Sequence, residues 1–188
     1  MPVSFRAFAS SPAGHWSNTL IAAARRQIGV TRYYDPAYVR LDYPRGDVPA
    51  DRGVCTDVIV RAFRDAFDVD LQKAVHEDME RAFGAYPEIW GLSRPDRNID
   101  HRRVPNLETF LTRQGARRPL PRYRSGWLPG DLATMRIDGL PHIAIVSDRF
   151  GRSGARKVIH NMGWGAQEDD VLRRFDLVHR FRFAPSAA

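Results

Sequence analysis

The sequence contains one cysteine, Cys55, among 188 residues. A single thiol rules out a disulfide within the chain and a zinc site built from several cysteines. No apolar run approaches the roughly 18 residues that a transmembrane helix needs. Residues 1–16 lack the apolar core of a signal peptide, so the sequence as given is not predicted to begin with an intact one. The length suits one domain with a substantial hydrophobic core.

Metal-binding patterns are also missing. The sequence has neither His-x-x-His nor His-Glu-x-x-His. Asp96, Asn98 and Asp100 have the spacing that opens a calcium loop, but the sixth position is His101 instead of Gly and the twelfth is Leu107 instead of Glu. The sequence therefore predicts no metal site and no cofactor.

The charge balance is basic. Lys plus Arg number 29 and Asp plus Glu number 22, which gives a net charge of +7. Such a surface is either simply solvated or attracts a polyanion, such as nucleic acid or an anionic polymer of the cell envelope. Zinc-finger spacing, an RNA-binding signature and a basic block with interleaved aromatic residues are all absent from the sequence, so we expect no nucleic-acid partner.

The pattern of helices and strands predicts an α+β protein with one domain over residues 16–188. Residues 1–15, rich in Ser, Ala, Pro and Gly, are expected to form a flexible arm. Helical periodicity predicts helices over 17–29, 56–67, 70–83 and 105–115. Short β-branched or alternating segments predict an antiparallel meander of strands over 131–137, 142–148, 157–163 and 177–183. Between the third and fourth of these helices, residues 84–105 are predicted to form a surface loop.

Cys55 lies where an extended segment turns into the second predicted helix. Backbone N–H groups and the dipole at a helix N-terminus favour a negative sulfur, so the position suits a nucleophile. A nucleophile needs a base, and His142 and His160 lie on neighbouring predicted strands. His142 is the candidate base, and either His160 or Asn161 can orient it, because adjacent strand residues face opposite ways. The alternative is that Cys55 is a small buried hydrophobic residue without chemistry.

The order of these segments resembles the NlpC/p60-type papain-like cysteine peptidases. The segments that carry the resemblance are ARRQIG, YYDPAY, GVCTDVIVRAF, LPGDLATM, HIAIVSD and KVIHNMG. From about Ala22 onward, the chain is more closely similar to a bacterial family of unknown function, DUF1287. That similarity is carried by YDPAYVRLDYPRGDVP, GVCTDV, DLQKAVHEDM, NIDHRRVPNL, GLPHIAIVSD and HNMGWGAQEDDVL.

The resemblance implies a papain-like fold in which N-terminal helices pack on a C-terminal antiparallel sheet. It also implies that Cys55 is the nucleophile, His142 the base and His160 the third catalytic residue, while Tyr34 helps to stabilise the oxyanion. The remaining candidates, for substrate binding, are Asp57, Asp100, His101, Arg102, Asn161 and Trp164. Val-Cys-Thr replaces the common Asp-Cys-Ser of the peptidases, so the resemblance does not fix the bond that is cleaved.

The expected activity is hydrolysis of an amide bond in bacterial peptidoglycan, by an amidase or an endopeptidase. The resemblance places such a protein in the periplasm or cell envelope, as a monomer that acts on peptidoglycan or its peptide fragments. Two alternatives are a cell-wall-binding module with an inert Cys55 and an acyltransferase that uses an amine acceptor. Delivery as a toxin, with an immunity or inhibitor protein as partner, is a further possibility for a chain of this kind.

Overall fold

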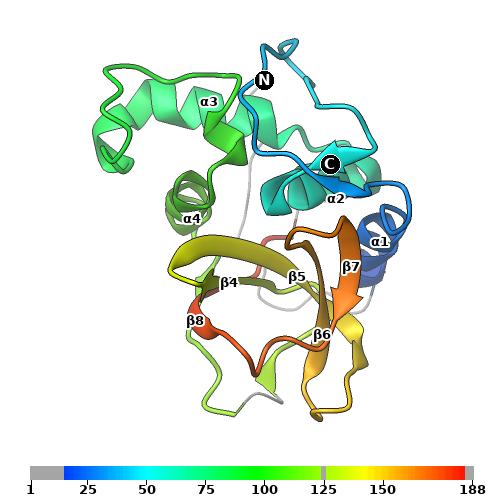
Figure 1. Ribbon diagram of the computed structural model, residues 1–188. Coiled ribbons are helices and arrows are strands. Elements are labelled where there is room, and N and C mark those ends of the chain that lie inside the picture. Colours follow the sequence, from blue (N-terminus) through cyan, green and yellow to red (C-terminus); the bar gives the residue numbers. More distant parts are fainter. Residues whose placement is uncertain (1–14, 124–125, 185–188) are drawn as a thin grey trace.

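The computed structural model describes residues 15–123 and 126–184. Its helices are α1 (His15–Arg25), α2 (Cys55–Phe67), α3 (Leu71–Ala82) and α4 (Val104–Arg113), with 3-10 turns η1 (Phe83–Ala85) and η2 (Asp100–Arg102). Its strands are β1 (Tyr33–Tyr34), β2 (Arg52–Gly53), β3 (Arg117–Arg118), β4 (Leu132–Ile137), β5 (Leu140–Phe150), β6 (Arg156–Asn161), β7 (Ala166–Asp169) and β8 (Asp176–Phe181). Figure 1 shows helices α2, α3 and α4 in one half of the molecule and the larger sheet in the other.

The predicted α+β class, with helices before an antiparallel sheet, is confirmed. Strands β4, β5, β6 and β8 fall within or close to the predicted strand segments. The first helix spans His15–Arg25, so it begins and ends earlier than the predicted range 17–29. The predicted surface loop over 84–105 is wrong at its end, because residues 100–102 form η2 and are buried. None of the helices in residues 15–123 and 126–184 is long and apolar enough to cross a membrane.

The larger sheet has the strand order β3-β8-β4-β5-β6-β7, and every neighbouring pair is antiparallel. Its side chains alternate between two clusters, as the pleat requires. One face packs against the helices with Leu132, Ile143, Ile145, Ile159 and Phe181. The other face forms a second cluster with Ala133, Met135, Ala144, Val146 and Val158, around the buried Trp127. Because α2 packs on β5 and β6, its first turn lies beside the sheet.

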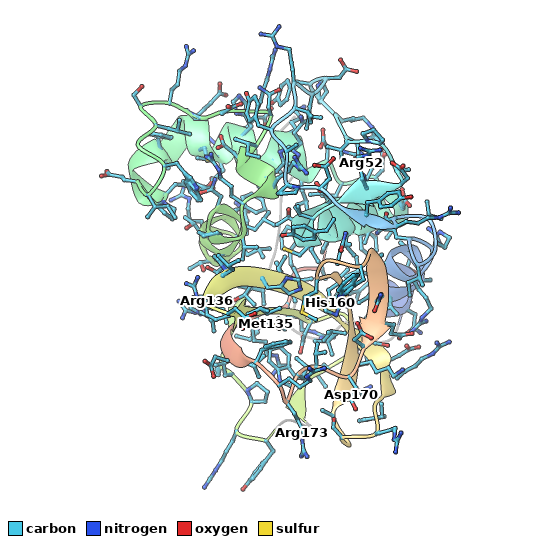
Figure 2. All side chains as sticks on the ribbon, in the orientation of Figure 1. Arg52, Met135, Arg136, His160, Asp170 and Arg173 are labelled. Carbon is cyan, nitrogen blue, oxygen red and sulfur yellow. The ribbon has the colours of Figure 1, made fainter. Side chains whose placement is uncertain are left out.

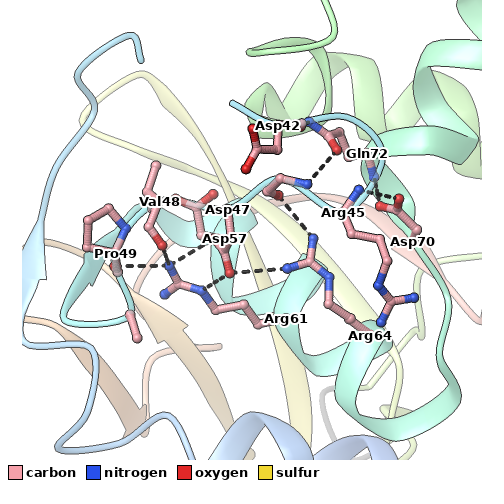
Figure 3. Close-up of polar contacts among 12 residues, drawn as sticks. Asp42, Arg45, Asp47, Val48, Pro49, Asp57, Arg61, Arg64, Asp70 and Gln72 are labelled. Carbon is pink, nitrogen blue, oxygen red and sulfur yellow. Dashed lines mark hydrogen bonds and ion pairs between the residues drawn. The ribbon is translucent and has the colours of Figure 1, made fainter. Parts of the chain in front are cut away.

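The chain between β1 and β2 is tied to α2 by arginine side chains (Figure 3). Arg61 of α2 pairs with the Asp47 carboxylate and donates to the carbonyl oxygens of Val48 and Arg52. Arg64, one turn later, donates to the carbonyl oxygen of Gly46. These bonds satisfy carbonyl groups of an irregular segment, and they fix the parallel β1–β2 pair next to the helix N-terminus.

Candidate active site

Cys55 is the first residue of α2, as the sequence predicts. Asp57 reaches back to accept a hydrogen bond of 2.6 Å from the Val54 N–H, which satisfies a donor that the helix leaves unpaired. Gly53 makes this geometry possible. Its φ is +152°, and a Cβ there would lie 2.8 Å from the Asp57 carboxylate. The Gly-Val-Cys-Thr-Asp sequence therefore encodes a tight entry into the helix with the thiol at its tip.

The Cys55 sulfur is buried, and burial raises the pKa of the thiol to about 11. Backbone N–H groups, first that of Ile143, hydrogen-bond to the sulfur and oppose the rise, while the nearby Asp57 charge adds to it. The sequence led us to expect a thiolate stabilised by the helix terminus. In the structure the cost of desolvating the charged form is larger, so the resting site holds a neutral thiol.

His142 lies on β5, between two residues that lie close to Cys55. The residue before it, Pro141, lines the same groove as Cys55, and the N–H of the residue after it, Ile143, bonds to the sulfur. Burial, with a further contribution from His160, lowers the pKa of His142 to about 3. The imidazole is therefore neutral at pH 7 and can accept a proton.

Two further side chains form a hydrogen-bonded chain that begins at His142. Its Nε2 lies 2.9 Å from Nδ1 of His160, and Nε2 of His160 lies 3.3 Å from Oδ2 of Asp169. Figure 2 shows His160 in the middle of the molecule, where the sheet approaches the helices. His160, and not Asn161, therefore contacts His142. Asp169 was not among the residues predicted from the sequence, because its strand β7 was not recognised there.

Asn161 makes different contacts. Its side-chain amide donates to the carbonyl oxygen of Gly53 at 2.9 Å and to that of Tyr33 at 3.3 Å. It thereby ties the end of β6 to both strands of the β1–β2 pair. Its position fixes the segments that carry Tyr34 and Cys55.

Tyr34 lies in β1, opposite Gly53 of β2, and lines the groove together with Cys55. Partial burial, followed by the proximity of Cys55 and Asp57, raises the pKa of its phenol above the usual 10. Tyr34 therefore keeps its proton and can donate a hydrogen bond beside the sulfur. This geometry suits the predicted oxyanion role.

A buried ion pair joins Arg102 to Asp57. The guanidinium of Arg102 donates to both carboxylate oxygens, at 3.0 and 3.1 Å. It also donates to the carbonyl oxygens of Asp35 and Ala37, one and three residues after Tyr34. Arg102 therefore locks the Tyr34 segment onto the first turn of α2 and offsets the Asp57 charge near the thiol.

The other predicted binding residues differ in exposure. Asp100 and His101 are almost fully buried in η2, whereas Trp164, in the β6–β7 loop, is 82% exposed. That loop lies against the chain before β1, because a Cβ on Gly165 would come within 2.4 Å of the Thr31 carbonyl oxygen. Substrate binding by these residues stays a prediction.

A groove of about 340 Å³ leads to Cys55. Its lining includes Tyr34, Pro36, Val54, Ile89, Trp90, Ile99, Arg102, Arg103, Val104, Pro105 and Pro141. Arg103 stacks over Trp90, with 4.2 Å between the guanidinium carbon and the ring centre. In the described part of the chain, His, Cys, Asp and Glu side chains form no group of three or more that could hold a metal ion. The groove therefore offers apolar walls and guanidinium groups to a ligand.

Burial of His101 predicts a pH-dependent stability. Desolvation lowers its pKa from 6.5 to about 4, so the unfolded chain binds more protons between these values. Stability from this group is complete above pH 6.5 and is lost as pH falls toward 4. Because one pKa unit corresponds to about 1.4 kcal/mol, the loss is on the order of 3 kcal/mol. Urea unfolding of His101→Gln between pH 4 and 7 should therefore show a shallower pH slope than wild type.

Asp100 supplies a control, because its contribution to the pH dependence of stability has the opposite sign to that of His101. Burial raises its pKa from 3.8 to about 6, so the folded state binds more protons in that interval. Its contribution to stability therefore falls as pH rises from 3.8 to 6, and Asp100→Asn should make the overall slope steeper. Equal slopes in wild type and both variants would contradict the assigned burial effects.

Together the fold and the site define an α+β protein with a helix-initial cysteine and a His-His-Asp chain on its sheet. The chain belongs to the family described as "Domain of unknown function (DUF1287)", which matches residues 21–183. This confirms the family resemblance found in the sequence. One relative is the uncharacterized protein YijF of Escherichia coli (strain K12), 55% identical over 169 residues, which cover 89% of this chain and 82% of that protein.

A solved structure with a similar arrangement is that of NlpC1 from Trichomonas vaginalis. The TM-score is 0.48 and the sequence identity is 13%. The similarity covers 93% of this chain and 46% of that protein, so the chain spans less than half of its length.

Proposed function

We propose that this protein is a cysteine hydrolase that cleaves an amide bond, with Cys55 as nucleophile and His142 as general base. The observations that carry the proposal are the hydrogen-bonded chain His142–His160–Asp169, in which both histidines are buried, and a helix-initial thiol that lines a groove together with Pro141, the residue before His142. Burying two histidine side chains is costly unless each has a partner. A binding module with an inert cysteine has no need for such a chain, and this favours catalysis.

The reaction begins from the neutral thiol and imidazole. As the sulfur attacks the carbonyl carbon of the amide, its proton passes to Nδ1 of His142, because Nε2 faces His160. The Cys55 N–H and the Tyr34 hydroxyl donate to the oxyanion that forms. Collapse of this intermediate breaks the C–N bond, and His142 returns the proton to the departing amine. Water, deprotonated by His142, then attacks the thioester. The C–S bond breaks, the acid is released, and His142 returns the proton to the Cys55 sulfur.

The proposed substrate is a peptide amide of bacterial peptidoglycan, and the proposed place of action is the cell envelope. The sequence resemblance to NlpC/p60-type peptidases supports both. The groove supports a peptide-like ligand, because its walls are mainly apolar and its charged lining groups are the guanidinium groups of Arg102 and Arg103. A net charge of +7 also favours association with an anionic polymer.

The proposal is tested by incubating the protein with purified peptidoglycan and analysing both partners by mass spectrometry. We expect new soluble fragments whose masses identify the bond, and a transient acyl group on the peptide that contains Cys55. Adding hydroxylamine should convert the acyl group to a hydroxamate. If the protein releases no fragments from peptidoglycan and carries no acyl group on Cys55, the proposal is wrong. Fragments that appear only with an added amine would identify an acyltransferase instead.

A further inference from the structure

We propose that Asp169 is a positioning residue that selects the catalytic tautomer of His142 through His160. The inference rests on the proposed function, because it concerns the base of that reaction. The geometry that carries it is the pair of contacts from His142 to His160 and from His160 to Asp169.

The sheet register brings Asp169 to His160. Asp169 is paired with Val158 across β6 and β7, so the two side chains point to the same face of the sheet. Val158 and His160 are two residues apart on one strand and share that face. Asp169 is therefore the diagonal neighbour of His160, whereas Glu168 faces the other way and pairs with Arg25 of α1.

The direction of the hydrogen bonds follows from the carboxylate. An ionised Asp can only accept, so Nε2 of His160 must carry the hydrogen that it shares with Asp169. In a neutral ring Nδ1 of His160 is then an acceptor, and Nε2 of His142 must donate to it. This leaves Nδ1 of His142 without a hydrogen, which is the form that can take the thiol proton.

The charge state of Asp169 agrees with this assignment. Its hydrogen bond with His160 holds the pKa of Asp169 below its usual range, so the carboxylate is ionised at neutral pH. Asp169 is partly exposed, with 37% of its side chain accessible, so replacing it does not open the core. Asp170, the next residue, instead bonds Ser153 in the β5–β6 turn, and Figure 2 shows it far from His160. Asp170 therefore offers a matched control.

The experiment uses the full chain labelled with ¹⁵N on histidine and records the ring nitrogens of His142 by NMR. In wild type and in Asp170→Asn we expect His142 with a hydrogen on Nε2 and none on Nδ1. In Asp169→Leu, which has no acceptor, a second population with hydrogen on Nδ1 should appear. Asp169→Asn keeps an oxygen acceptor without charge and should fall between the two. If Asp169→Leu does not fold, the comparison of wild type with Asp169→Asn tests the inference instead.

A second experiment measures the rate at which each variant releases fragments from peptidoglycan. We expect about a 100-fold loss for Asp169→Leu, at the lower end of what general base catalysis supplies, and a partial rescue by Asp169→Asn. An unchanged His142 tautomer in the folded Asp169 variants would overturn the inference. If wild type releases no fragments but the tautomer changes as expected, the proposed function fails and the assignment of Asp169 stands.

Discussion

Replacement of Cys55 by alanine should abolish amide hydrolysis, with a loss on the order of 10⁴- to 10⁶-fold in rate. No other residue can supply a thiol, because Cys55 is the single cysteine of the chain. The rate of fragment release from peptidoglycan, followed by mass spectrometry, measures the effect. The substitution removes only a sulfur at a site that is 4% exposed, so the cost in stability should be about 1 kcal/mol.

Two controls make this result specific to chemistry. Circular dichroism and the urea midpoint should show that Cys55→Ala remains folded. The alanine variant should still bind peptidoglycan in a sedimentation assay, because the groove walls are unchanged. A variant that binds and also cleaves at the wild-type rate would show that the sulfur is not the nucleophile.

Breaking the Arg102–Asp57 pair should have the largest effect on stability. The two side chains are 2% and 4% exposed, so removal of one partner leaves a buried charge without compensation. We expect Arg102→Met to destabilise the fold by about 3–5 kcal/mol in urea unfolding. It should also slow hydrolysis, since the backbone that follows Tyr34 loses its two hydrogen bonds to the guanidinium.

A double-mutant cycle measures the coupling free energy between Arg102 and Asp57. Asp57→Asn combined with Arg102→Met removes both charges, so the double variant should lose less stability than the sum of the single losses. The exposed pair Lys73–Glu77 on α3 is a matched comparison, and its removal should cost only about 0.3–0.5 kcal/mol. If the cycle at Arg102 and Asp57 gives an equally small coupling, the pair does not hold the site together.

The sequence predicts the parts of the fold in which local pattern decides the structure. Helical spacing and a terminal position identify α2 with Cys55 at its start, and alternation identifies β5 and β6 with both histidines. Adjacent residues of β6 face opposite sides of the sheet, so either His160 or Asn161, but not both, can orient His142. The choice between them depends on how the strands pack against the helices, which local pattern does not contain.

The parts that were missed depend on tertiary contacts. Strand β7 has the sequence AQED, which is too polar and too short to be identified as a strand, so Asp169 could not be placed. The expectation of an ionised sulfur failed because the benefit of a helix terminus can be read from sequence, whereas the depth of burial cannot. Arg102 and Asp57 are 45 residues apart, and nothing in their local sequence indicates that they pair.

The uncharged state of Cys55 also bears on damage by oxidants. Hydrogen peroxide reacts with the ionised form of an accessible sulfur, and Cys55 at rest is neither ionised nor exposed. The resting protein should therefore withstand peroxide that would inactivate an enzyme with a preformed ion pair. Its sulfur loses the proton only during turnover, when the proton passes to His142 and the bound amide covers the sulfur.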